Sequence, residues 1–262
     1  MAKSILLVVL AVLPTLLIAY LVYRNDKHKE PFRILISLFL FGILSALGVI
    51  CISVLLESFI PVFSKDVAIM NVIELVLKVF IEIALIEELC KWLIIYIFGY
   101  KNTEFDETYD IIIYAIFVAL GFATIENIMY VLRENTIGLA VQRALFSVPG
   151  HTSYAIFMSY YLCKAKINRY KGNKKEEKTN IILSIAIPTI IHGIFDFCLF
   201  ADNEIYLIIF LAFTVVLFIM AFEKLRSLYK ANASLFSIKR CCKNCSYKFY
   251  GIDCPNCGTR QD

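Results

Sequence analysis

The sequence predicts an all-α polytopic membrane protein of about seven transmembrane helices, followed by a small cysteine-rich tail. Hydrophobic residues make up 60% of the 262 residues, against about 45–50% in soluble domains, and the mean hydropathy is +0.74. Charged residues make up only 18%, against about a quarter in soluble proteins. The basic residues lie between the apolar runs, so we expect a membrane as partner and no nucleic acid.

The first apolar run, Ile5–Tyr23, is uncharged and long enough to cross a bilayer. No small-residue cleavage site follows it, so we predict a retained helix and not a signal peptide. Six further runs of about 20 residues each follow: Ile34–Leu56, Val79–Gly99, Ile111–Leu132, Ala144–Cys163, Ile181–Phe200 and Ile205–Phe222. The stretch Met70–Lys78, before the third span, could be an interfacial helix or a tilted extension of that span, so the number of spans could also be eight.

The distribution of Lys and Arg favours seven spans, with the N-terminus outside and the C-terminus in the cytoplasm. The loops that would then be cytoplasmic carry four basic residues (24–33), one (100–109) and seven (164–180). Apart from Lys78, at the end of the stretch Met70–Lys78, the outer loops carry one (Lys65), two (Arg133 and Arg143) and none. This excess follows the positive-inside rule of multi-pass cell-membrane proteins.

Several ionisable residues lie inside the predicted spans, where each costs roughly 2.5–3.5 kcal/mol on the insertion scale. Such residues are functional candidates, whereas Glu57, Glu74 and Glu82 lie towards span ends and are expected to be interfacial. The alternative is that buried polar residues only hold helices together by hydrogen bonds. The candidates, from four different spans, are Glu87, Glu88, Lys91, Glu126, His151, His192 and Asp196.

Spacing along the helices predicts which candidates meet. At roughly 100° per residue, Lys91 lies about 40° from Glu87 and 60° from Glu88, so one ammonium can pair with both carboxylates. An acid and a base at one site are what hydrolysis needs. His192 and Asp196 are four residues apart, so the carboxylate can orient the imidazole.

Depth gives an independent indication of a shared site. Counted from the outer ends of their spans, Glu87, Glu126, His151 and His192 lie six to eight residues deep. At about 1.5 Å per residue, this puts all four roughly 9–12 Å below the outer surface. We therefore predict one buried polar site assembled from four helices, nearer the outer face.

Four motifs follow one another along the predicted spans, after an early loop Asp26…Glu30-Pro31. They are Glu87-Glu88-Leu-Cys-Lys91, Asp110-Ile-Ile-Ile-Tyr114 leading to Gly121-Phe122-Ala-Thr-Ile-Glu126-Asn127, Arg143…Pro149-Gly150-His151, and His192-Gly-Ile-Phe-Asp196. These motifs and the early loop resemble the PrsW family of intramembrane proteases, which is similar in turn to the CAAX prenyl endopeptidases and to the Aph subunit of γ-secretase. The resemblance covers about residues 20–200, and the order of the four motifs makes it specific.

The resemblance implies peptide-bond hydrolysis, typically the first cleavage of a membrane-anchored anti-sigma factor in stress signalling, and the depth of the polar residues predicts that the cut lies near the outer face. It carries catalytic roles to Glu87, Glu88, Glu126, His151 and His192, with Lys91 and Asp196 in support. Our hypothesis is that a carboxylate of the Glu87/Glu88 pair, near Glu126, activates a water, and that one histidine stabilises the oxyanion. A metal-dependent reaction stays open, but no His-Glu-x-x-His signature is present and a glutamate-based reaction without an active-site metal is favoured.

Two other classes of function compete with a protease. A non-catalytic scaffold of the Aph type would keep the polar layer for assembly alone. An ion- or proton-coupled transporter would use buried carboxylates and histidines as its path, although such proteins often show two related halves, and no repeat is evident here.

The composition changes after Phe222, so we divide the chain into a membrane domain (1–222), a basic linker (223–240) and a tail (241–262). Two Cys-x-x-Cys pairs in the tail can give four thiolates to one tetrahedral ion, as in a structural zinc ribbon, and the expected cytoplasmic side disfavours disulfides. We predict structural Zn²⁺ there and an appendage for an unknown partner. The expected ligands are Cys242, Cys245, Cys254 and Cys257, with Cys241 left over.

Overall fold

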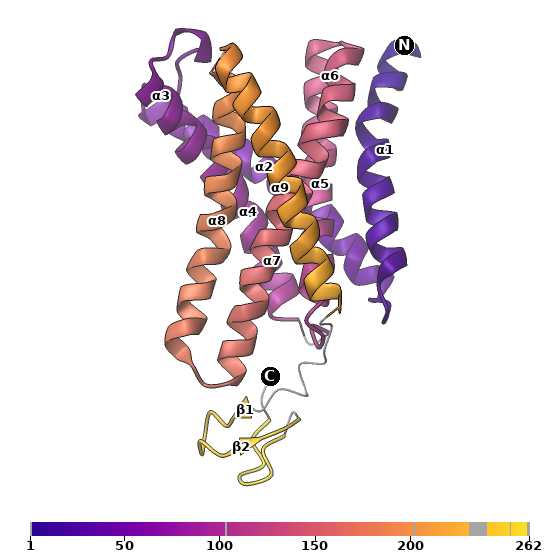
Figure 1. Ribbon diagram of the computed structural model, residues 1–262, viewed down its shortest axis with the longest axis vertical. Coiled ribbons are helices and arrows are strands. Elements are labelled where there is room, and N and C mark those ends of the chain that lie inside the picture. Colours follow the sequence, from indigo (N-terminus) through magenta and orange to yellow (C-terminus); the bar gives the residue numbers. More distant parts are fainter. Residues whose placement is uncertain (1, 103, 202, 231–239, 252, 261–262) are drawn as a thin grey trace.

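The computed structural model describes residues 2–102, 104–201, 203–230, 240–251 and 253–260. The predicted apolar runs form long helices that lie side by side in a bundle (Figure 1). The five uninterrupted helices are also long and apolar enough to cross a membrane. They are α1 (Ala2–Asn25), α2 (Phe32–Phe59), α5 (Asp110–Glu134), α8 (Lys174–Phe200) and α9 (Glu204–Lys230).

Two further helices of the bundle are built from joined segments that include π-helical turns. The third predicted span comprises α3 (Val72–Leu77), η2 (Lys78–Leu85), α4 (Ile86–Ile94) and η3 (Ile95–Tyr100), after a short 3₁₀ turn, η1 (Val67–Ile69). The fifth comprises α6 (Ile137–Gln142), η4 (Arg143–Ser147) and α7 (Val148–Tyr170). The described part of the chain thus has seven long helices at the positions of the seven predicted spans, and five of them are long and apolar enough to cross a membrane. Most of the stretch Met70–Lys78 extends the third of these helices and forms no separate eighth one.

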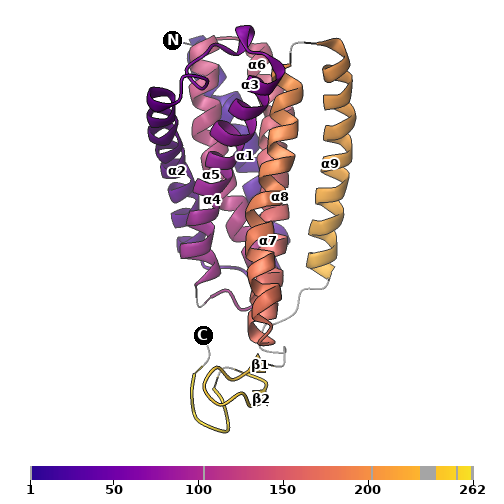
Figure 2. The same ribbon diagram turned by 90° about the vertical axis from the view of Figure 1, so that its left-hand side faces the viewer.

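Helix α5 forms the axis of the bundle. Protein surrounds it, since 83% of its most apolar window is buried, against 22% for the windows of α1 and α9. Figure 2 shows α9 at one edge of the molecule and α2 at the opposite edge. The sequence Asp110–Glu134 therefore supplies the core, while the apolar faces of α1, α2 and α9 are left for lipid.

The backbones of α2 and α5 meet at two glycines. A Cβ atom on Gly121 would overlap the carbonyl oxygen of Phe39, and one on Gly42 would overlap the carbonyl oxygen of Val118. Only glycine fits where two helix backbones approach this closely. The crossing fixes the position of α5 along its axis relative to α2, and α5 is the helix that carries Glu126.

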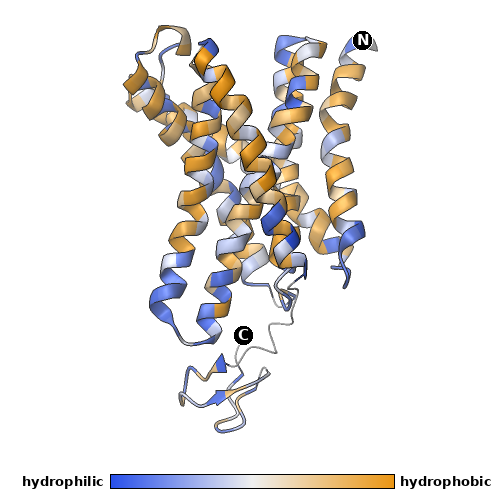
Figure 3. Cartoon of the chain, viewed as in Figure 1, coloured by the Kyte–Doolittle hydropathy of each residue, from blue (hydrophilic) through white to orange (hydrophobic). Residues whose placement is uncertain are grey.

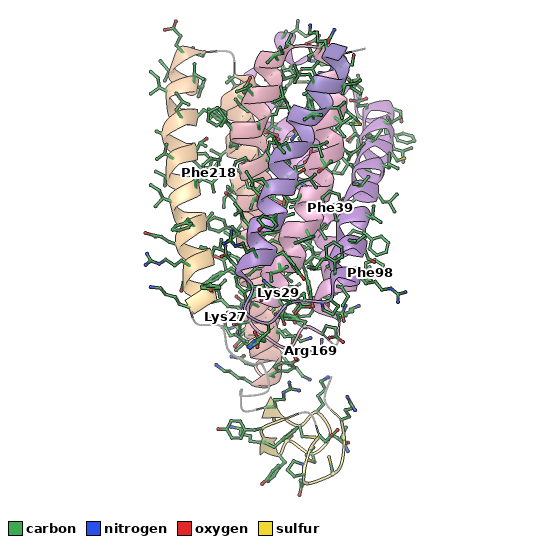
Figure 4. All side chains as sticks on the ribbon, turned by 90° about the vertical axis from the view of Figure 1, so that its right-hand side faces the viewer. Lys27, Lys29, Phe39, Phe98, Arg169 and Phe218 are labelled. Atoms are coloured by element: carbon green, nitrogen blue, oxygen red, sulfur yellow. The ribbon has the colours of Figure 1, made fainter. Side chains whose placement is uncertain are left out.

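Hydrophilic residues gather at the lower ends of α7 and α8 and in the tail, whereas the long helices are hydrophobic over most of their length (Figure 3). Lys27, Lys29 and Arg169 lie at this same end (Figure 4). The basic loops that the sequence predicts to be cytoplasmic are thus on one side of the bundle, together with the tail.

The tail contains a two-residue antiparallel ribbon, β1 (Arg240–Cys241) paired with β2 (Lys248–Phe249). The guanidinium of Arg240 lies 3.9 Å from the centre of the Tyr170 ring, at the end of α7. Helix α9 continues to Lys230, so the first part of the predicted linker 223–240 is helical, and residues 231–239 lie outside the described residues. The tail therefore contacts the turn between α7 and α8.

A cluster of buried carboxyl groups joins the α1–α2 loop to α5. The Asp26 side chain accepts hydrogen bonds from the backbone N–H groups of His28 and Glu30, and the Tyr114 hydroxyl donates to Glu30. Burial raises the pKa of Glu30 to about 7, because desolvation outweighs the hydrogen bond from Tyr114. The fold therefore favours the neutral acid at this position.

We expect the thermal stability of the protein to fall between pH 5 and pH 8, and a Glu30→Gln variant to lose part of this dependence. A group whose pKa is raised in the folded state stabilises the fold below its unfolded pKa, near 4.5, and loses that contribution as pH rises through about 7. Thermal midpoints in detergent at several pH values measure the effect. Glu204→Gln, at an exposed position, is the control, and parallel curves for wild type and Glu30→Gln would contradict the prediction.

Candidate active site

The centre of the buried polar site is Lys91 on α4. Its Nζ atom lies 3.2 Å from Oε2 of Glu87 and 2.8 Å from Oε1 of Glu88. Lys91 is 2% exposed and Glu88 is 1% exposed. One ammonium thus pairs with both carboxylates along one helical face, as the spacing predicts.

His151 on α7 links this centre to α5. Its Nδ1 atom lies 3.1 Å from Nζ of Lys91, and its Nε2 atom lies 2.8 Å from Oε2 of Glu126. An ammonium group can only donate, so Nδ1 accepts and Nε2 carries the hydrogen that is donated to Glu126. The ring therefore has a defined tautomer and orientation.

His192 on α8 completes the cluster. Its Nδ1 atom lies 3.0 Å from Oε1 of Glu88, and its Nε2 atom lies 3.3 Å from Oδ2 of Asp196. The structure thus brings together all seven candidates named from the sequence, from α4, α5, α7 and α8. Their proximity is observed, while their chemical roles stay predictions.

Arg143 belongs to the site, although the sequence placed it in an outer loop. Its Nη2 atom lies 2.8 Å from Oε2 of Glu126, because residues 143–147 form the π-helical segment η4, continuous with α7. The guanidinium carbon of Arg143 also lies 4.0 Å from the centre of the Tyr130 ring. The signal in the sequence was the spacing of eight residues to His151, about two helical turns.

Aromatic rings pack against the polar cluster around Lys91. The Phe122 ring centre lies 4.0 Å from Nζ of Lys91, and the Tyr154 ring stacks on His192 with a centre separation of 4.6 Å and an interplanar angle of 20°. Phe122 stands out in the sequence only as part of a motif, and Tyr154 does not stand out at all, because an aromatic residue in an apolar helix carries no distinguishing signal.

A cavity of about 240 Å³ opens on one side of this cluster. Glu87 lines it, whereas Glu88 and Lys91 are not among its lining residues. The cavity also reaches Leu139 on α6 and Phe200 at the end of α8, both towards the end of the bundle opposite the tail (Figure 1). The carboxylate of Glu87 is therefore accessible from that side.

The outer carboxylates have other partners. Lys78 lies 2.9 Å from Glu82 and 3.8 Å from Glu57, and Lys65 pairs with Glu74. These ion pairs lie outside the cluster around Lys91, as expected for interfacial residues.

Donor atoms that could hold a metal ion gather in three places within the described residues. In each group the donor atoms lie within 4.8 Å of one another. In the tail they are the four predicted cysteines, with Sγ–Sγ distances of 3.5 Å for Cys242–Cys257 and 3.6 Å for Cys245–Cys254. The other two groups are Glu87/Glu126/His151 and Glu87/Glu88/His192.

Comparison with known proteins identifies the family. The profile of a family described as PrsW family intramembrane metalloprotease matches residues 30–222. The protease PrsW of Clostridioides difficile (strain 630) is 32% identical over 234 residues, 88% of this chain and 94% of the relative. The protease PrsW of Oceanobacillus iheyensis is 36% identical over 81% of this chain and 91% of its own length. That of Bacillus subtilis (strain 168) is 30% identical over 82% and 92%. No solved structure matches the chain.

Proposed function

The chain belongs to the PrsW family of intramembrane proteases, and on this premise we propose that it hydrolyses peptide bonds of membrane-anchored proteins near the outer face of the membrane. The observation that carries the proposal is the cavity in which Glu87, Glu126, His151 and His192 converge from four helices. Such a site can hold a peptide bond and a water away from bulk solvent.

Glu87 is the general base in this proposal. Its carboxylate lines the cavity, whereas Glu88 is enclosed by Lys91 and His192. Glu87 takes a proton from a water, the water oxygen attacks the carbonyl carbon, and the proton then passes to the amide nitrogen as the C–N bond breaks. Glu88 is a positioning residue that holds Lys91 and His192.

Glu126 lines the same cavity, with a carboxylate oxygen within 4.8 Å of one of Glu87, and is held by Arg143 and His151. These two donors fix its carboxylate without filling the cavity, so it can orient the attacking water. The suggestion from the sequence that a histidine stabilises the oxyanion has less support, because His151 directs its Nε2–H at Glu126.

The family description raises the question of an active-site metal, and Glu87, Glu126 and His151 fit one by donor type, since zinc takes carboxylate oxygens and imidazole nitrogens. A bound zinc would supply a Lewis acid for the carbonyl group. We favour the reaction without it, because the Lys91 ammonium lies within 3.2 Å of donors on Glu87 and His151 and would repel a second cation.

We expect one zinc ion per chain, bound by Cys242, Cys245, Cys254 and Cys257. Elemental analysis of the purified protein should show one equivalent, and replacing the four cysteines by serine should remove it, while hydrolysis survives a chelator. A second equivalent that persists in the serine variant and disappears with Glu87→Gln would instead establish a metal-dependent reaction.

The N-terminus is proposed to lie outside and the C-terminus in the cytoplasm. The basic residues at one end of the helices support this orientation (Figure 4). With this orientation, the cavity reaches towards the outer face. We further propose an anti-sigma factor as the substrate, which would place the protein in stress signalling.

The test compares membrane-protein fragments in cells that lack the gene, complemented with wild type or with Glu87→Gln/Glu88→Gln at equal expression. We expect released ectodomains, with new ends near the outer interface, only with wild type. New ends in the cytoplasm would contradict the orientation. Full function of the Gln variant would favour the scaffold, and a pH-coupled ion flux would favour the transporter.

A further inference from the structure

We propose that Tyr154 is a catalytic residue whose phenolic O–H donates a hydrogen bond to the scissile carbonyl oxygen as that oxygen becomes an oxyanion. The inference rests on the proposed function. The acid–base residues do not stabilise the negative charge on the carbonyl oxygen, and the inference assigns this role to Tyr154. Donors aimed at the developing oxyanion are among the largest contributions to acyl-transfer catalysis.

Tyr154 is 2% exposed, and its hydroxyl has no hydrogen-bond partner among the described residues. Buried hydroxyl groups are nearly always satisfied in native proteins, and an exception calls for an explanation. Because Tyr154 lines the same cavity as Glu87 and Glu126, a group bound in the cavity can supply the missing acceptor.

The ring is held in one orientation by both histidines. It stacks on His192 at 4.6 Å and packs at 80° against His151, with ring centres 5.8 Å apart. A donor fixed in this way needs no rearrangement as charge develops, which is the condition for effective electrostatic stabilisation.

The two histidines are already committed as donors or acceptors. The nitrogens of His151 face Lys91 and Glu126, and those of His192 face Glu88 and Asp196. Of the three stacked rings of His151, His192 and Tyr154, the Tyr154 ring is therefore the one that keeps a donor for a substrate.

Gly150, one turn earlier on α7, leaves room beside the hydroxyl. A Cβ atom there would lie 3.3 Å from Oη of Tyr154 and 3.7 Å from the Phe195 ring. The glycine thus leaves room for the Tyr154 hydroxyl itself at this point of the helix.

The test uses purified full-length protein in lipid vesicles and the membrane protein identified by the fragment comparison. Tyr154→Phe removes only the hydroxyl and keeps the ring stack. We expect kcat to fall about 100-fold with KM within about twofold of wild type. A peptide phosphinate built on the cleavage site, which carries a tetrahedral anion, should lose affinity by a similar factor. Tyr160→Phe, on the same helix outside the cavity, should match wild type in both assays.

The outcomes separate the two proposals. If wild type cleaves and Tyr154→Phe cleaves equally fast, or loses kcat without loss of phosphinate affinity, the role of Tyr154 is overturned and the proteolytic function stands. If wild type cleaves no membrane protein, both the proposed function and the role of Tyr154 are wrong. An unchanged thermal midpoint of Tyr154→Phe shows that a loss of activity is not a loss of fold.

Discussion

Replacing Lys91 by Met should destabilise the protein by about 3–5 kcal/mol and abolish hydrolysis, the largest single-residue effect that we expect. The substitution keeps the apolar stem and removes the only side-chain ammonium that pairs with Glu87 and Glu88 in the described residues. Two buried carboxylates then remain side by side without an ammonium between them. Deleting one partner of a buried ion pair costs far more than the pair itself contributes.

Lys65→Met is the matched control for this substitution. Lys65 also pairs with a glutamate, but its side chain is 43% exposed, so its loss should cost less than about 1 kcal/mol. Equilibrium unfolding in detergent, together with the yield of folded protein, compares the two variants. Equal stabilities would show that Lys91 is not the counter-ion on which the site depends.

Gly121→Val should destabilise the protein by about 3 kcal/mol or more and reduce hydrolysis as well. The new side chain would overlap the backbone of Phe39, which cannot rotate aside as a side chain can. Helix α5 must then move away from α2, and Glu126 moves with it relative to His151. Overpacking against backbone lies at the upper end of the costs measured for enlarged core residues.

Gly48→Val tests whether the effect comes from the crossing and not from the loss of a glycine. Gly48 lies on α2, and among the described residues no atom beyond its own stretch of helix lies within 4 Å of a Cβ placed on it. This variant should keep the thermal midpoint and activity of wild type. If both variants lose the same stability, the α2–α5 contact is not the reason for the glycine at 121.

The seven spans and the seven clustered side chains could be predicted because they rest on local physics. Bilayer thickness sets the length of an apolar run, and helical periodicity sets which neighbours share a face. Lys91 follows Glu87 and Glu88 by four and three residues within a regular α-helical stretch, so the angle of about 100° per residue held there.

Other features depend on contacts between distant segments and could not be read from the sequence. Which of Glu87 and Glu88 faces the cavity is set by the positions of α7 and α8 and not by α4 itself. Arg143 looked like a loop residue because the helix that contains it begins earlier than its apolar run. Tyr154 is distinguished only by what surrounds it.

The contact between the tail and the α7–α8 turn joins two parts of one chain, so it can persist with a low intrinsic affinity. Nine residues, 231–239, connect Lys230 to Arg240, so the ribbon and its docking position are parts of one molecule. Short tethers give effective concentrations on the order of millimolar. The stacking of Arg240 on Tyr170 therefore needs only weak intrinsic affinity to stay formed in the intact chain. The same ribbon added as a separate peptide would dissociate at micromolar concentration.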